Sequence, residues 1–144
     1  MRGAIQILIV LAIMTMASGC AMPGPGERDG VFIHISSGAR DPQRVLVGLN
    51  VAVSMAGNKD VIVYFDAKGI EAALKDSENL SYAQFSFSHD QIKKLAEKGV
   101  GLYACPDSLK AAGKTREDLL PGVKLADKEL FFKFTTGRIL TMDY

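Results

Sequence analysis

Three short hydrophobic runs constrain this fold more than any other feature of the sequence. Residues 31–35 and 61–65 are almost entirely hydrophobic, and residues 99–104 form a third run of the same kind. Runs that do not alternate with polar residues are typical of strands buried on both faces of a parallel sheet. His34 interrupts the first run, and we interpret it as a hydrogen-bonded core residue rather than a ligand.

Helical patterns separate these runs. Asp41 and Pro42 begin the first helix, because aspartate is a favoured N-cap and proline suits the first helical position. Ser88 and Gln91 have the spacing of a capping box at the start of a second helix. Weaker patterns predict further short helices and two more strands, at residues 123–125 and 139–142. This alternation predicts an α/β fold with a parallel five-stranded sheet and helices on both faces.

The amino terminus has the pattern of a targeting segment. A hydrophobic run over residues 5–16 is short for a transmembrane helix and fits a signal peptide. Ala17-Ser18-Gly19-Cys20 resembles the lipobox of bacterial lipoproteins, where the chain is cut before a cysteine that receives lipid. We therefore predict a signal peptide at 1–19, lipidated Cys20 with a Pro/Gly-rich tether at 20–30, and a domain at 31–144. An uncleaved anchor or a plain secretory signal is the alternative.

These alternatives share one prediction about location. Each places the folded domain outside the cytoplasm, and the lipoprotein interpretation places it on the periplasmic side of a membrane, anchored by the lipid on Cys20. The sequence does not distinguish an inner from an outer membrane.

Cys105 would be the sole free thiol if Cys20 carries lipid, since the chain has two cysteines. It ends the third predicted strand, and ligands in open α/β sheets gather at the carboxyl ends of strands. Backbone amides at the start of the next helix favour its thiolate, whereas the charge of Asp107 opposes it. Two interpretations stay open, a reactive nucleophile and a buried structural cysteine.

Two other segments follow predicted strands and are candidate substrate-binding residues. Ser36, Ser37 and Gly38 form a loop whose backbone amides could hold an anion, although a plain tight turn has the same composition. Asp66 follows the second strand. A parallel sheet would place all of these residues and Cys105 at one edge, where they could face one another across a cleft.

The charge balance and the motifs exclude several classes of partner. Lysine and arginine total 17 against 16 acidic residues, for a formal net charge of +1, whereas nucleic-acid-binding proteins usually carry a strong basic patch. The sequence has no glycine-rich phosphate loop ending in Gly-Lys-Ser/Thr and no cysteine pair for zinc or redox chemistry. We expect no nucleic-acid partner, no metal and no cofactor.

Several short motifs, taken in order, give the chain a family resemblance. They are Ser36-Ser37-Gly38, Asp41-Pro42, Gly69, Gly99-Val100, Ala104-Cys105 and Leu119-Leu120-Pro121-Gly122-Val123. In this order, residues 31–144 resemble the DsrE/DsrF-like family, which includes sulfur-relay and sulfur-oxidation proteins. The resemblance implies a three-layer α/β/α fold and a tendency to form homo-oligomers. In the sulfur-handling members it implies a cysteine that carries a persulfide, and that cysteine maps onto Cys105.

Two functions from different classes follow. The first is an extracytoplasmic sulfur carrier or sulfurtransferase, in which Cys105 exchanges sulfane sulfur with donor and acceptor proteins or small persulfides. The second is a noncatalytic binding or assembly module. Its oligomer contacts would come from the carboxyl-terminal residues and from the unassigned stretch 75–87, which contains Tyr82, Phe85 and Phe87 and could instead be a flap over the site. A one-cysteine thiol peroxidase is a third hypothesis, although the sequence shows no base beside Cys105.

Overall fold

The structure is a computed structural model, and it describes residues 26–144. The predicted signal peptide and the lipidation of Cys20 fall outside the described residues. Among the helices within residues 26–144, none is long and hydrophobic enough to cross a membrane.

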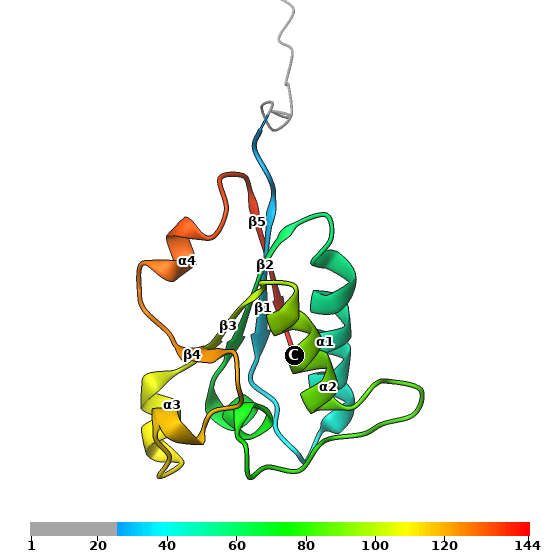
Figure 1. The fold of residues 1–144 in the computed structure, drawn as a ribbon, viewed down its shortest axis with the longest axis vertical. Helices are drawn as coiled ribbons and strands as arrows, with labels where there is room; N and C mark the ends of the chain where they lie inside the picture. The colour runs from blue at the N-terminus through cyan, green and yellow to red at the C-terminus, as the bar shows by residue number, and fades with distance from the viewer. Residues whose placement is uncertain (1–25) are drawn as a thin grey trace, which may run out of the picture.

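A five-stranded parallel sheet forms the centre of the domain (Figure 1). Every pair of neighbouring strands is parallel, in the spatial order β4-β3-β2-β1-β5. The strands are β1 (Gly30–Ile35), β2 (Asp60–Phe65), β3 (Gly101–Ala104), β4 (Val123–Leu125) and β5 (Ile139–Asp143). The predicted α/β fold with five parallel strands and flanking helices is confirmed.

The helices differ in length and lie between successive strands. They are α1 (Pro42–Met55), α2 (Ser88–Glu97), α3 (Pro106–Ala111) and α4 (Leu130–Lys133), with 3₁₀ turns η1 (Ala67–Ala73) and η2 (Arg116–Asp118). Asp41 caps α1 as predicted, since its carboxylate accepts a hydrogen bond from the Arg44 amide at 3.3 Å.

The capping box predicted for α2 does not form. The residue at the N-cap is Phe87, and Ser88 is the first helical residue. The Ser88 hydroxyl instead accepts from the Leu80 amide at 2.9 Å, because the loop over residues 75–87 folds back against the start of α2. Leu80 is buried there, whereas Tyr82 and Phe87 are exposed.

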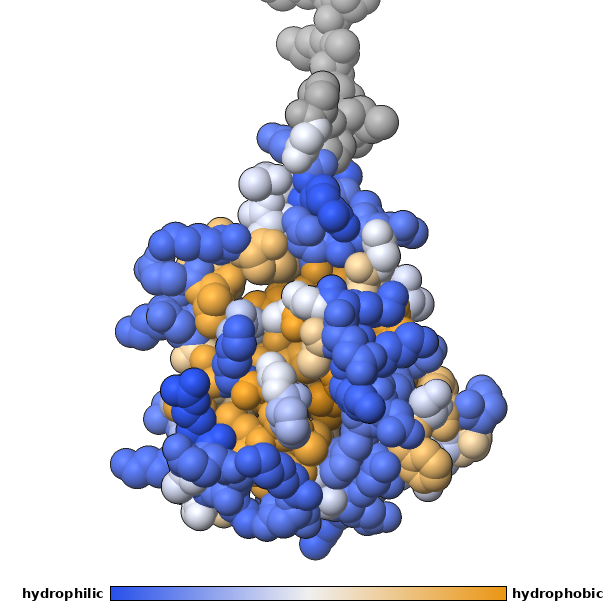
Figure 2. Space-filling model, in the orientation of Figure 1, coloured by the Kyte–Doolittle hydropathy of each residue, from blue (hydrophilic) through white to orange (hydrophobic). Residues whose placement is uncertain are grey.

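The two faces of the sheet are covered unequally. From β1 to β4, each new strand is added on the same side of the previous one. Right-handed crossovers therefore place α1 and α2 on one face of the sheet. Only the return from β4 to β5 crosses the opposite face, and its helix, α4, has four residues. We call this the open face. Figure 2 shows hydrophobic side chains at the surface in the middle of the molecule, bordered by hydrophilic ones.

Side chains along β1 differ in burial between the two faces of the sheet. Ile33 and Ile35 face the main core and are 0% exposed. Phe32 and His34 lie on the open face and are only partly buried. The prediction that this strand is buried on both faces is therefore wrong for the open face, because the short α4 cannot cover it.

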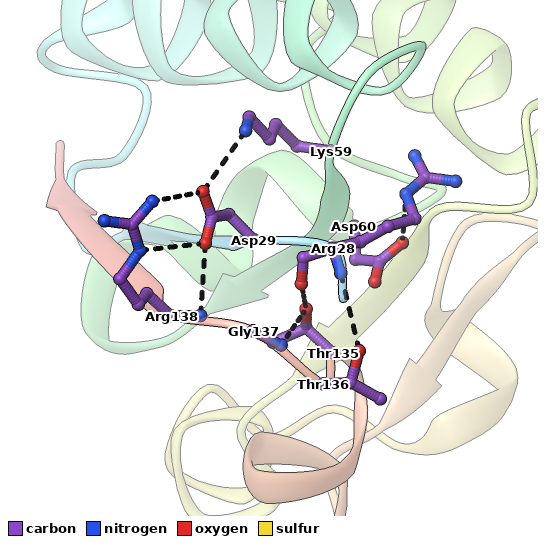
Figure 3. A network of polar contacts seen from close by, with 8 residues as sticks. All are labelled: Arg28, Asp29, Lys59, Asp60, Thr135, Thr136, Gly137 and Arg138. Atoms are coloured by element: carbon purple, nitrogen blue, oxygen red, sulfur yellow. Dashed lines mark hydrogen bonds and ion pairs between the residues drawn. The ribbon is translucent and has the colours of Figure 1, made fainter. Parts of the chain in front are cut away.

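A polar network closes the end of the sheet where the strands begin (Figure 3). Asp29 accepts two hydrogen bonds from the Arg138 guanidinium, at 3.1 and 2.9 Å, and pairs with Lys59 at 3.4 Å. Arg28 pairs with Asp60 at 3.2 Å. These contacts join the segment before β1 to the start of β5, on the opposite end of the sheet from Cys105.

Candidate functional site

Cys105 lies immediately after β3, at the carboxyl edge of the sheet. Its amide donates to the Phe65 carbonyl at 2.8 Å, which keeps it in register with the end of β2. It is also the N-cap residue of α3, and its carbonyl accepts from the Leu109 amide at 3.0 Å. The residue is partly buried, so the thiol occupies neither the hydrophobic core nor a fully exposed loop.

The surroundings of Cys105 favour its thiolate. Partial burial raises the pKa of the thiol, but hydrogen bonds from the hydroxyls of Ser108 and Tyr64 and from the amides of Ser108 and Asp107 lower it by more. The net shift is downward from the ordinary value. Asp107, which the sequence suggested would oppose the thiolate by its charge, contributes a backbone N–H that stabilises it.

Ser108 is held in place by the neighbouring strand. The Ala67 amide, just beyond β2, donates to the Ser108 hydroxyl oxygen at 3.0 Å. The hydroxyl proton is thus left to point toward the sulfur of Cys105. Ala67 has a φ of +44°, in the left-handed region that favours glycine, so the backbone is strained at the residue whose amide contacts Ser108.

Tyr64 reaches Cys105 from the open face of β2. Its ring packs edge-on against Phe131 of α4, with ring centroids 5.2 Å apart, and against Phe32 at 6.1 Å. Burial first, and then the hydrogen bond to Cys105, raise the pKa of the Tyr64 phenol. The phenol therefore stays protonated at neutral pH and acts as a donor to the thiolate.

His34 connects the carboxyl ends of three neighbouring strands. Its Nε2 lies 2.8 Å from an Asp66 oxygen after β2, and its Nδ1 lies 2.6 Å from an Asp143 oxygen on β5. The imidazole also stacks on Tyr64, with ring centroids 5.8 Å apart. Burial lowers the pKa of His34, but the hydrogen bonds to Asp143 and Asp66 outweigh it, and the net shift is upward.

The loop of Ser36, Ser37 and Gly38 is a separate part of the edge. The amides of Ser36 and Ser37 donate to the Tyr144 carbonyl, at 2.7 and 3.1 Å, and so are already engaged. The loop lines a hollow of about 570 Å³ over residues 36–41, with Lys68 and Glu71 on its other wall. Cys105 and Asp66 are not among the residues that line it.

The structure thus gathers some predicted site residues and separates others. Asp66 joins His34 beside the strand end that carries Cys105, whereas Ser36, Ser37 and Gly38 line a different hollow. A substrate-binding role for these four residues stays a prediction. Sequence reasoning missed Tyr64, Ser108, Asp143 and the role of His34 at the edge. Alternation along β2 was a usable signal, because it places Tyr64 and Asp66 on one face.

Within residues 26–144, no group of three or more histidine, cysteine, aspartate or glutamate side chains is arranged to hold a metal ion. The two nitrogens of His34 point to carboxylates on opposite sides of the ring, so these three groups do not converge on a common point.

The fold and the site together define a class. The protein is an α/β protein with a parallel five-stranded sheet and a single thiol at the carboxyl end of the third strand. A sequence model of the DsrE/DsrF-like family matches residues 29–135, and the chain belongs to that family.

Solved structures of other proteins share this fold. The ychN protein from E. coli superposes with a TM-score of 0.62 at 12% identity, over 81% of this chain and 99% of the other. A protein of unknown function from Methanobacterium thermoautotrophicum, MTH1491, gives a TM-score of 0.57 at 26% identity, over 82% of this chain and 100% of the other. A comparison with curated protein sequences gave no significant match.

Proposed function

We propose that this protein is a sulfur carrier or sulfurtransferase that holds sulfane sulfur as a persulfide on Cys105. The Cys105 thiolate attacks the outer sulfur of a donor persulfide, the donor S–S bond breaks, and the donor leaves as a thiolate. An acceptor thiolate then attacks the outer sulfur of the Cys105 persulfide, and Cys105 leaves as a thiolate in turn. Each step is an exchange of one S–S bond for another, so no external oxidant or reductant is required.

One observation carries this proposal: the thiol of Cys105 lies at the carboxyl edge of β3 with its pKa lowered by Ser108 and Tyr64. The thiolate is the nucleophile in such exchanges, and it is also the leaving group in the second step, so the same donors assist both. Membership of the DsrE/DsrF-like family, which is broadly linked to sulfur relay, supports the assignment.

Persulfide loading tests the proposal directly. The full chain is incubated with glutathione persulfide, and mass spectrometry of the Cys105 peptide is expected to show the mass of one added sulfur atom. Cys105→Ser removes that gain, whereas Cys20→Ser leaves it in place. Transfer of the sulfur onward to an added thiol would show a carrier. A wild-type peptide that gains nothing from several persulfide donors refutes the proposal.

A noncatalytic assembly module is the second candidate, and a specific observation favours it. Hydrophobic side chains remain exposed on the open face and along edge strand β5, including Phe132, which is 79% exposed, and Leu140, which is 55% exposed. Light scattering of the full chain measures its oligomeric state, and Leu140→Lys is expected to lower it if β5 is an interface. In this case Cys105→Ser leaves assembly unchanged.

We also propose that the domain works outside the cytoplasm as a lipoprotein anchored to the membrane through Cys20, with donor and acceptor proteins or small persulfides as partners. Metabolic labelling with a fatty acid is expected to mark the protein expressed from its full sequence in a bacterial host and to fail in Cys20→Ser. Labelling that survives this substitution contradicts the anchoring proposal.

A further inference from the structure

His34 and its two carboxylate partners form a cluster that the sulfur-transfer step itself does not use. Asp66 and Asp143, when ionised, can only accept hydrogen bonds, and a neutral imidazole has one donor and one acceptor nitrogen. Contacts of 2.8 and 2.6 Å to the two nitrogens are therefore both hydrogen bonds only if both nitrogens carry hydrogen. With both carboxylates ionised, this geometry fits an imidazolium that donates to each of them.

The position of this cluster relates it to Cys105. Phe65 pairs with Ala104 across β2 and β3, so Asp66 and Cys105 follow at the next register position on neighbouring strands. Side chains at alternate positions share a face, which places Asp66, Cys105 and Tyr64 on the open face with His34. The His34 ring stacks directly on Tyr64, the residue that donates to Cys105.

The protonation state of His34 sets the net charge of this cluster at the carboxyl edge of the sheet. The titratable groups facing His34 are Tyr64 and Asp66 from β2 and its end, and Asp143 from β5. Without the imidazolium, the two carboxylates would place a net charge of −2 at the edge where a thiolate or a persulfide anion must form. The imidazolium reduces this charge to −1.

We propose that His34 is a positioning residue for Cys105, whose imidazolium, clamped between Asp66 and Asp143, offsets carboxylate charge at this edge and so favours the anionic forms of the Cys105 sulfur. The functional importance of these anionic forms rests on the proposed sulfur transfer, in which the thiolate attacks and leaves. The charge effect itself belongs to the thiol and is measurable without any sulfur donor.

The test is the pH dependence of Cys105 alkylation by iodoacetamide in the full chain, followed on the Cys105 peptide by mass spectrometry. His34→Gln is expected to move the midpoint to higher pH by about half a pKa unit and to slow alkylation at neutral pH by about twofold, because the loss of thiolate is partly offset by its higher nucleophilicity. Asp66→Asn, which removes a negative charge, is expected to move the midpoint to lower pH. The double variant has the wild-type net charge at the edge and is expected to return toward the wild-type midpoint.

His89→Gln is the matched control, because the His89 side chain contacts Ser77 beside α2, which covers the face of the sheet opposite the open face. A His34→Gln profile that coincides with wild type overturns the inference. So do shifts of His34→Gln and Asp66→Asn in the same direction, which would indicate structural disturbance. If His34→Gln does not fold, as judged by circular dichroism, the midpoint of Asp66→Asn decides alone.

Persulfide loading of the same proteins separates this inference from the proposed function. If the Cys105 peptide never gains sulfur but the midpoints move as expected, the charge role of His34 stands and the sulfur-carrier function fails. If loading succeeds and the midpoints do not move, the reverse holds.

Discussion

Replacing Tyr64 by phenylalanine removes one hydroxyl group from the candidate site and keeps the ring that packs against Phe131. That hydroxyl is, after Ser108, the largest influence lowering the pKa of Cys105. A hydrogen bond to a charged group contributes about 1.5–3 kcal/mol. Because Cys105 is partly exposed, we take the lower end, which corresponds to a rise of about one pKa unit.

This rise has opposite effects on the alkylation rate in two pH ranges. At neutral pH the thiolate population falls about tenfold, but a thiolate of higher pKa is intrinsically more nucleophilic by about threefold. Alkylation of Cys105 in Tyr64→Phe is therefore expected to slow about threefold near pH 7 and to become about threefold faster on the alkaline plateau. The two rate profiles should cross.

The assay is iodoacetamide alkylation across the pH range, with Cys105 read from its own peptide so that Cys20 does not contribute. Tyr103→Phe is the control, because Tyr103 is a partly buried phenol on the same face of the neighbouring strand and is not among the main groups that shift the pKa of Cys105. If Tyr64→Phe and wild type give the same profile, or if Tyr103→Phe shifts it equally, the role assigned to Tyr64 is wrong.

Three further predictions concern stability. Hydrogen bonds from Arg138 lower the pKa of Asp29 to about 2, so its stabilising effect is present above its ordinary value of 3.8 and is lost as the pH falls toward 2. In urea unfolding, the difference between wild type and Asp29→Asn should therefore shrink over that range, and a constant difference would contradict the pairing. Leu49 is fully buried, and Leu49→Ala is expected to cost about 3 kcal/mol in the free energy of unfolding, against under about 0.5 kcal/mol for Leu140→Ala on the surface. The pKa of His34 is raised above its ordinary 6.5, so the stability it contributes is complete below that value and is lost as the pH rises through the raised one. The melting temperature of His34→Gln should therefore lie further below that of wild type at pH 6 than at pH 9, and a gap that widens with pH would refute this.

Much of the fold follows from local patterns in the chain. The hydrophobic runs locate β1, β2 and β3, and Asp41-Pro42 marks the start of α1, because strand burial and helix capping depend on residues that are close in sequence. The prediction of a capping box at Ser88 was wrong because of a contact with a residue outside the helix. The hydroxyl that was expected to cap the helix is used instead by the returning loop, at Leu80.

The strand order is determined by the tertiary structure and does not follow from local sequence patterns. The sequence predicts five strands but does not reveal that β5 pairs with β1 rather than extending the sheet beyond β4. To reach that position, the chain returns from β4 across the sheet to the opposite edge, and this connection, with its short helix α4, crosses the open face. The consequence is the partly exposed aromatic surface around Phe32 and Tyr64, where the sequence predicted a strand buried on both sides.

The candidate site divides in the same way. The sequence alone determined that a single thiol, Cys105, ends the third strand, because a hydrophobic run stopped by Pro106 defines that position locally. Only the tertiary structure decided which groups surround that edge. Tyr64 comes from β2, Asp66 is the residue just beyond it, and Asp143, the other partner of His34, comes from β5. Hydrogen bonds between residues more than a hundred positions apart depend on strand order and register, and these are settled by packing of the whole sheet.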